Sequence, residues 1–173
     1  MLTQEEVKEL LDYNPETGVF VWKRRENARE TWNTRYAGTV AGSYDYEGYW
    51  RMAIHNKTQK AHRIAWLYVY GEFPSDQIDH INGIKNDNRI KNLRVVSSKI
   101  NHENKKKGKS NNKYSNLLGV TFCKKVKKWK AQITYDKKCH FIGFYDRPED
   151  AHYAYLQAKI KHHIGYVPNE TKA

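Results

Sequence analysis

The stretch QIDHINGIKNDNRIKNLRVVSSKIN (residues 77–101) contains an Asp-His pair and five asparagines. Asparagine is a poor former of both helix and strand, so such a cluster indicates either Asx-turns or a functional site. The pattern predicts a short strand that ends at Asp79-His80, an asparagine-rich loop, and a second strand over LRVV (residues 93–96). Ser97 or Ser98 then caps a helix that includes Asn101.

This order of strand, loop, strand and helix could bring Asp79, His80 and Asn101 together. Carboxylate and amide oxygens are hard ligands that suit Mg²⁺ or a similar ion. A neutral histidine beside the ion can take a proton from water, and metal plus base is what phosphodiester hydrolysis requires. By itself the Asp-His pair can arise by chance, and a histidine at a strand end is commonly structural. The specific signal for a catalytic site is the Asp-His pair together with the asparagine-rich loop and Asn101 at this spacing.

Charge is concentrated further along the chain. The formal net charge is +12, and the window from Lys105 to Lys138 holds twelve lysines and a single acid, Asp136. Such a block repels itself unless a polyanion neutralises it, so nucleic acid is the expected partner. The alternative is that these lysines form an ordinary solvent-exposed surface that binds no nucleic acid. An anionic membrane is disfavoured, because no basic amphipathic helix with a long apolar face occurs.

The composition indicates how large the hydrophobic core can be and in which cellular compartment the protein is expected. The 173 residues suit one medium domain or two to three small modules, and 39% hydrophobic content with 23 aromatic residues predicts a small, aromatic-rich core. Cys123 and Cys139 form no C-x-x-C pair, so we expect free thiols rather than structural zinc. The start of the chain does not resemble a signal peptide, and no apolar run is long enough to span a membrane. A cytoplasmic protein is expected.

Local signals predict several further elements before the asparagine-rich stretch. They are a helix capped by Thr3 with Glu6 in a capping box, a strand over GVFVWKRR (18–25), a hairpin about Asn56-Lys57, and a helix over residues 61–70 that ends at Gly71.

After a basic linker the pattern changes to three short strands and a helix. The strands are LLGVTFCKK (117–125), KWKAQITY (128–135) and HFIGFY (140–145), and the helix begins near Pro148. In the middle strand apolar residues alternate with Lys and Gln, which predicts one face against the helix and one open basic face. Phe141 is the one aromatic residue expected on that open face.

The segment DHINGIKNDNRIKNLRVVSSKIN (79–101) resembles the HNH endonuclease family with its ββα-metal motif, particularly the homing endonucleases of phages and introns. The resemblance implies that Asp79 is the metal carboxylate and His80 the general base. It further implies that Asn92 ties the loop and orients the base, and that Asn101 is the third motif position. That position is His in many members and Asn in others, so weaker metal affinity is expected. His102 could replace Asn101, although it projects about 100° away on the helix.

The resemblance extends to both sides of this motif. YNPETGVFVWKRR (13–25), AGTVAGS (37–43) and AHRIAWLYVYGEFP (61–74) resemble the segment that often precedes it, and residues 117–158 resemble an AP2 domain. AP2 domains lay a three-stranded sheet in the DNA major groove. The predicted fold is α+β, with an N-terminal β-rich segment, an HNH ββα-metal module, a basic linker, and a three-stranded antiparallel sheet with one packed helix. The expected domains are 1–74 (DNA-contacting), 75–105 (HNH), 106–113 (linker) and 114–173 (AP2-like).

The expected function is that of a site-specific, metal-dependent DNA endonuclease of the homing type that uses Mg²⁺ or Mn²⁺. Because each chain carries one site, we expect a monomer that nicks one strand of double-stranded DNA, in the bacterial host cytoplasm if the gene is phage-encoded. The alternatives are a sequence-specific DNA-binding regulator with an inactive HNH module, and an RNA-binding protein, which aromatics on the open sheet face would favour.

Candidate DNA contacts come from the basic sheet and from the motif itself. Gln132 and Thr134 are expected to read bases, while Lys124, Lys125, Lys128 and Lys130 are expected mainly on phosphates. Arg89 and Arg94 are either phosphate clamps near the metal or structural residues. His62 is expected to be a hydrogen-bonded structural residue rather than a catalyst.

Overall fold

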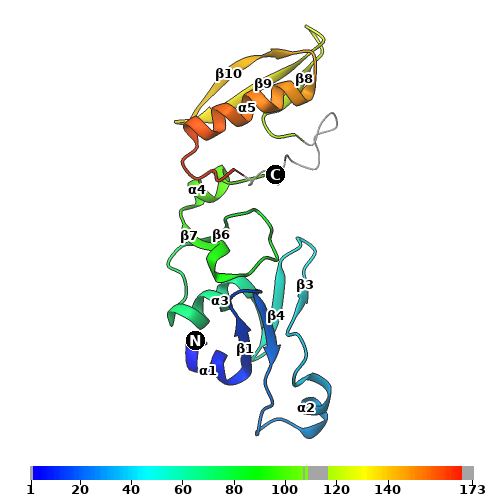
Figure 1. Ribbon diagram of the computed structural model, residues 1–173, viewed down its shortest axis with the longest axis vertical. Helices are drawn as coiled ribbons and strands as arrows, with labels where there is room; N and C mark the ends of the chain where they lie inside the picture. The colour runs from blue at the N-terminus through cyan, green and yellow to red at the C-terminus, as the bar shows by residue number, and fades with distance from the viewer. Residues whose placement is uncertain (1, 107, 109–116, 169–173) are drawn as a thin grey trace. The chain divides into compact units, whose positions relative to one another are not determined.

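The computed structural model describes residues 2–106, 108 and 117–168, and the chain divides into two compact units, residues 1–97 and 98–173 (Figure 1). Both units combine helices with small antiparallel sheets, which confirms the predicted α+β class. The predicted linker, residues 106–113, lies mostly outside the described residues. Within those residues, no helix is both long enough and apolar enough to cross a membrane.

The first unit contains three α-helices, a 3₁₀ turn and seven strands among its described residues. They are α1 (Gln4–Leu10), β1 (Leu11–Asn14), β2 (Val19–Trp22), α2 (Glu30–Tyr36), β3 (Ser43–Tyr44), β4 (Trp50–Ile54), β5 (Lys57–Lys60), α3 (Ala61–Tyr70), β6 (Gln77–His80), η1 (Ile90–Asn92) and β7 (Leu93–Val96). β1 pairs with β2, β4 lies between β3 and β5, and β6 pairs with β7, all antiparallel.

Local signals in the sequence locate two of these helices correctly. The Thr3 hydroxyl accepts a hydrogen bond from the Glu6 backbone N–H at 3.2 Å, and the Glu6 carboxylate accepts from the Thr3 N–H at 2.8 Å, so the predicted capping box is confirmed. α3 ends at Gly71 in the left-handed conformation, as predicted. The β4–β5 turn lies one residue earlier than predicted, at His55 and Asn56, which both have positive φ.

One hydrophobic core joins the elements of the first unit. Its buried side chains come from α1, β1, β2, β4, α3, β6 and β7 and from the loop before β3: Val7, Leu11, Tyr13, Phe20, Ala41, Met52, Ile54, Ala61, Ile64, Ala65, Leu67, Ile78 and Leu93. Because β6 and β7 contribute Ile78 and Leu93, the Asp-His strand is anchored to the same core as the preceding helices.

The β1–β2 turn packs directly against the asparagine-rich loop. Gly18 has φ +75°, and a Cβ atom there would lie 2.5 Å from the Arg89 backbone nitrogen and 2.6 Å from the Asn88 carbonyl carbon. The Ile90 N–H donates to the Pro15 carbonyl at 3.2 Å in the same region. Glycine is therefore required at position 18 by both conformation and space.

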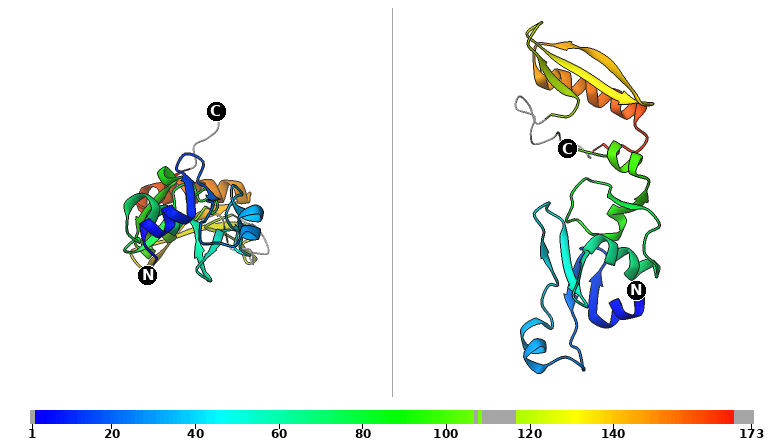
Figure 2. Two further views of the ribbon diagram at one scale, coloured as in Figure 1. Left: turned by 90° about the horizontal axis from the view of Figure 1, so that it is seen from below. Right: turned by 180° about the vertical axis from the view of Figure 1, so that it is seen from behind.

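The second unit is a three-stranded sheet covered by a helix, with a short helix before it. Its elements are α4 (Ser98–Glu103), β8 (Val120–Cys123), β9 (Lys128–Tyr135), β10 (Lys138–Tyr145) and α5 (Pro148–His162). The strand order is β10-β9-β8, and α5 lies across one face of the sheet (Figures 1 and 2). Ala131 and Ile133 of β9 are buried, as are Ala151 and Tyr155 of α5, so the predicted β-β-β-α arrangement is confirmed.

The open face of this sheet carries more aromatic surface than predicted. A β-bulge between Phe141 and Gly143 shifts the alternation of β10, so that Phe141 pairs with Gln132 and Phe144 with Lys130. Both phenylalanines therefore lie on the open face, 56% and 42% exposed, with ring centroids 5.0 Å apart. The prediction of a single aromatic residue there was wrong, because a strict period of two cannot anticipate a bulge.

α4 is held by the last turn of α5 and the segment after it. The Glu103 carboxylate accepts from the Gly165 N–H at 2.9 Å, and the Asn104 side-chain oxygen accepts from the Val167 N–H at 3.2 Å. The Lys159 ammonium, only 1% exposed, donates to the Lys105 carbonyl at 2.5 Å. The residues that end α4 are therefore fixed by the C-terminal part of the second unit.

We expect Gly18→Ala to destabilise the first unit by about 3 kcal/mol or more, because the new methyl group overlaps the backbone of the asparagine-rich loop. Gly48→Ala is the matched control, since Gly48 has φ +86° but open space around it, and should cost about 1 kcal/mol. Denaturant unfolding followed by tryptophan fluorescence measures both. Equal losses in the two variants would contradict the close packing of this turn.

Candidate functional site

The β6–β7 hairpin places the two candidate catalytic side chains at its end. Asp79 lies opposite Arg94 and His80 opposite Leu93, and Asp79 and His80 are 6% and 5% exposed. Beyond the strands, the Ile81 N–H donates to the Asn92 carbonyl at 2.9 Å, which closes the hairpin at the base of the loop. The predicted strand, loop and strand are confirmed.

Asp79 is paired with the arginine across the hairpin. Both Nε and Nη2 of Arg94 approach Asp79 Oδ2, at 2.9 and 2.7 Å, and both side chains are largely or partly buried. Such a charge-assisted pair fixes the carboxylate and offsets the cost of burying its charge. Arg94 is thus bound to the candidate metal carboxylate, and its role as a phosphate clamp stays a prediction.

The loop between the strands is organised by side-chain hydrogen bonds. Asn92 spans it, because its Oδ1 accepts from the Asn82 N–H at 3.0 Å and its Nδ2 donates to the Asp87 carbonyl at 2.8 Å. The Asp87 carboxylate accepts from Asn82 Nδ2 at 2.6 Å and from two nitrogens of Arg89, at 2.7 and 2.5 Å. These hydrogen bonds to Arg89 are the main reason why the pKa of Asp87 is lowered. Arg89, like Arg94, is engaged in an ion pair.

Asn88, to which the sequence assigned no role of its own, lies against the His80 ring. Asn88 is 2% exposed, and its Oδ1 lies 3.3 Å from His80 Nε2, within hydrogen-bond distance. An amide oxygen can only accept, so this contact favours the tautomer with the proton on Nε2 and makes Nδ1 the basic nitrogen. Burial lowers the pKa of His80 from 6.5, and the hydrogen bond to Asn88 opposes this shift. The ring is therefore neutral near neutral pH.

His62 of α3 lies against His80, which the sequence also did not anticipate. The two ring centroids are 5.1 Å apart at 89°, and the Tyr49 ring lies 5.5 Å from His62 and 6.0 Å from His80. His62 is 6% exposed, and burial, followed by the charge of His80, lowers its pKa to about 3. Its Nδ1 has no hydrogen-bond partner among the described residues, and its role as a structural residue rather than a catalyst stays a prediction.

The residues of this hairpin are compatible with a divalent ion that keeps most of its waters. No group of three or more His, Cys, Asp or Glu side chains in the described part of the chain could hold a metal ion. Mg²⁺ needs few protein ligands because it keeps several waters, so one buried carboxylate beside a neutral histidine is compatible with it. Asn101 lies on α4, in the second unit, and its role as a ligand stays a prediction.

The predicted DNA contacts on the second unit share the face that α5 leaves open. Lys130 and Gln132 of β9 are half-buried, while Lys128 and Thr134 are exposed, and Lys128 pairs with Asp146 at 3.1 Å. Lys124 and Lys125 lie exposed in the turn after β8. This face combines cations, hydrogen-bonding groups and two phenylalanines.

Comparison with known proteins points to one family for the central segment. Residues 59–103, from β5 to α4, match the model of a family described as HNH endonuclease. The chain is also 28% identical over 101 residues to a Bacillus subtilis (strain 168) protein named "SPbeta prophage-derived putative HNH homing endonuclease YosQ". That match covers 58% of this chain and 55% of the relative, so the chain spans about half the length of the curated relative it matches.

A solved structure described as "DNA binding and cleavage by the HNH homing endonuclease I-HmuI" is also similar. It has 24% sequence identity and a TM-score of 0.40, and the match covers 54% of this chain and 49% of that one. Residues 117–158, for which an AP2 domain was predicted, lie outside the segment that matches the HNH endonuclease family, and the AP2 resemblance stays a prediction.

His62 should make the first unit sensitive to acid. An unfolded histidine titrates near pH 6.5, whereas folded His62 stays neutral down to about pH 3. Between these pH values the unfolded chain binds a proton at His62 that the folded chain does not. The contribution of neutral His62 to the free energy of unfolding is therefore complete above pH 6.5 and is lost as the pH falls. Between pH 6.5 and about pH 5, the free energy of unfolding of His62→Phe should therefore fall less steeply than that of the wild type, by up to about 1.4 kcal/mol per pH unit.

Denaturant unfolding at several pH values measures this effect through tryptophan fluorescence, since four of the five tryptophans lie in the first unit. His55→Asn is the control, because His55 is exposed in the β4–β5 turn, where asparagine tolerates the positive φ. An acid dependence in His62→Phe equal to that of the wild type would contradict this role of His62.

Proposed function

We propose that this chain is a metal-dependent DNA endonuclease of the HNH homing type that nicks one strand of double-stranded DNA. The observation that carries the proposal is the pairing of a buried, neutral His80 with the neighbouring Asp79 at the end of a hairpin, inside the segment that matches HNH endonucleases. A histidine that is neutral near physiological pH suits a general base.

In this proposal His80 takes the proton of the attacking water through Nδ1, while Asn88 holds the opposite nitrogen. Asp79 holds a divalent ion, with Asn101 as a second ligand, and the ion supplies positive charge that stabilises the leaving oxygen of the phosphodiester. Asn92 keeps the loop closed, so that Asn88 stays against the His80 ring.

DNA binding is assigned mainly to the second unit, as an AP2-like sheet that enters the major groove. Gln132 and Thr134 read bases, and Lys124, Lys125, Lys128 and Lys130 contact phosphates. Residues 1–105 then form the cutting part and residues 114–173 the anchor. Because Glu103 and Asn104 are bonded to Gly165 and Val167, the anchor also supports the end of α4.

A regulator with an inactive nuclease module is the second candidate. The observation that favours it is the ion pair between Arg94 and Asp79, because an arginine on the carboxylate competes with a metal ion. The two candidates differ in a single respect: only the endonuclease cleaves DNA.

We expect the wild type to convert supercoiled phage or plasmid DNA to open circles in Mg²⁺ and to be inactive in EDTA. His80→Ala should lower the cleavage rate by about 10²–10⁴-fold, because the base that activates water is lost. Its affinity for DNA, measured in EDTA, should stay near that of the wild type.

His55→Asn is the matched histidine control and should cleave normally. Cleavage by His80→Ala at the wild-type rate would refute the assignment of the base. A wild-type protein that binds DNA and never cleaves it in Mg²⁺ or Mn²⁺ would favour the regulator, and linear DNA that forms without an open-circle intermediate would contradict nicking.

A further inference from the structure

A second candidate site lies at the α2 end of the first unit. In Figure 1 and in the right-hand view of Figure 2, α2 lies at the opposite end of this unit from β6 and β7. The residues before and along α2 line a pocket of about 480 Å³, a size typical of small-molecule sites. The lining residues are Arg25, Ala28, Arg29, Thr31, Trp32, Arg35 and Tyr36. None of these seven lining residues carries a carboxylate.

Arg25 is held rigidly within the wall of the pocket. Its backbone N–H donates to Asn33 Oδ1 at 3.0 Å, and its carbonyl accepts from Asn33 Nδ2 at 2.9 Å. Its guanidinium lies over the rings of Trp32 and Trp22, at 4.0 and 4.8 Å from their centroids. Arg25 Nε is buried without a hydrogen-bond partner in the described residues. Burial of this donor carries a desolvation cost, and the stacked guanidinium forms a fixed part of the wall.

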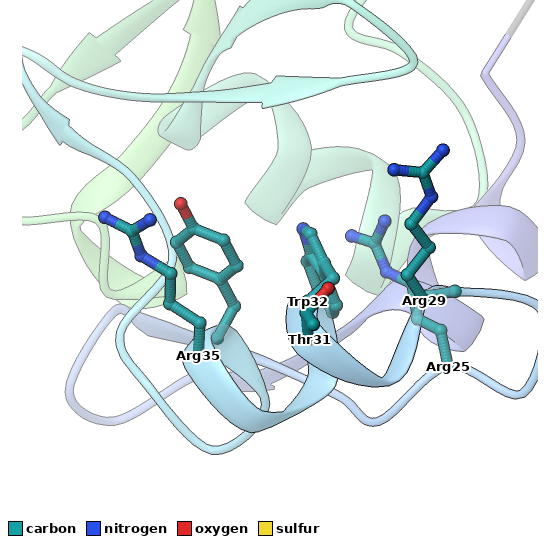
Figure 3. A pocket seen from close by; sticks show the side chains of 7 residues that line it. Arg25, Arg29, Thr31, Trp32 and Arg35 are labelled. Carbon is teal, nitrogen blue, oxygen red and sulfur yellow. The ribbon is translucent and has the colours of Figure 1, made fainter.

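Two further arginines stand on either side of Trp32. Figure 3 shows Arg35 on one side of Trp32, with Arg25 and Arg29 on the other. Arg29 and Arg35 are exposed, and neither forms an ion pair within the described residues. Arg24, which does not line the pocket, is instead engaged by both oxygens of Glu30, at 2.9 and 2.8 Å. Of the four arginines before and along α2, the three that line the pocket therefore have no ion pair within the described residues.

Aromatic rings complete the wall. Trp32 and Tyr36 have centroids 5.3 Å apart, and Tyr36 is 36% exposed, with the Arg35 guanidinium 5.3 Å from its ring centroid. Aromatic rings beside arginines are the usual means of binding unstacked nucleotides, because every base offers a planar face and every phosphate a charge.

We propose that this pocket binds one unpaired nucleotide of a DNA strand, with its base against Trp32 and Tyr36 and its phosphate between Arg29 and Arg35. The backbone of an intact duplex is contacted by protruding cations and does not need a hollow with aromatic walls. A base that has left the stack fills such a hollow. This site is separate from His80, and its binding does not require cleavage.

The test measures binding of the full-length protein to a labelled oligothymidylate of about 15 nucleotides, and to a mixed-sequence duplex, by fluorescence anisotropy in EDTA. Arg29→Gln and Arg35→Gln should each weaken single-strand binding and reduce the slope of log affinity against log salt by about 0.7. Tyr36→Leu should weaken single-strand binding roughly five- to hundredfold and duplex binding much less. All three positions are exposed or at the edge of exposure, so the fold should persist, which circular dichroism checks.

Arg24→Gln is the matched control, since it removes the same charge one residue from Arg25 but outside the pocket. It should leave single-strand affinity and salt slope close to the wild type. The proposal is overturned if Arg29→Gln and Arg35→Gln lose no more than Arg24→Gln, if the wild type does not bind the oligothymidylate, or if duplex binding falls as much as single-strand binding in all three variants. Because EDTA removes the metal, an inactive nuclease would not affect any of these results.

Discussion

The hydrogen bond between His80 Nε2 and Asn88 Oδ1 is the contact on which the rest of the candidate site depends. Because an amide oxygen can only accept, this contact favours a proton on Nε2 and leaves Nδ1 as the basic nitrogen. A buried imidazole could otherwise adopt either tautomer. Holding an amide oxygen in place requires a loop that cannot move, which explains why so many asparagines occur in so few residues. Asn82, Asn88 and Asn92 each bind another part of the loop.

The first unit supports this loop from several directions. The Tyr13 hydroxyl donates to the Asn88 carbonyl at 2.7 Å, and Gly18 allows the β1–β2 turn to approach the same peptide. On the sheet side, the Tyr44 hydroxyl accepts from Asn86 Nδ2 at 2.9 Å. His62 and Tyr49 bury the His80 ring, which keeps it neutral. The residues upstream of the motif therefore build the environment of the base, in addition to any contact with DNA.

The sequence predicts the elements with strong local signals and misses those that depend on distant contacts. The α1 capping box, Gly71 and the strand that ends at His80 were predicted because the residues that specify them are neighbours. α2 was missed because it is short and polar, and its ordering comes from Arg25, Asn33 and the tryptophans of two elements. The contacts of Asn88 and His62 with the His80 ring were missed for a similar reason, since only the fold brings α3 and the loop to the ring. The bulge in β10 lies beside Gly143, and a glycine within a strand pattern is a signal of a bulge that the assumption of strict alternation did not use.

The most direct test of this account is the protonation state of the His80 ring in the metal-free, full-length protein. Ring ¹⁵N chemical shifts, assigned with a His80→Gln variant and followed against pH, report both the tautomer and the pKa. The account predicts a neutral ring near neutral pH, with the proton on Nε2 and a pKa below 6.5. A ring that is charged near neutral pH, or that carries its proton on Nδ1, would contradict the central claim that Asn88 and burial prepare His80 to act as a base.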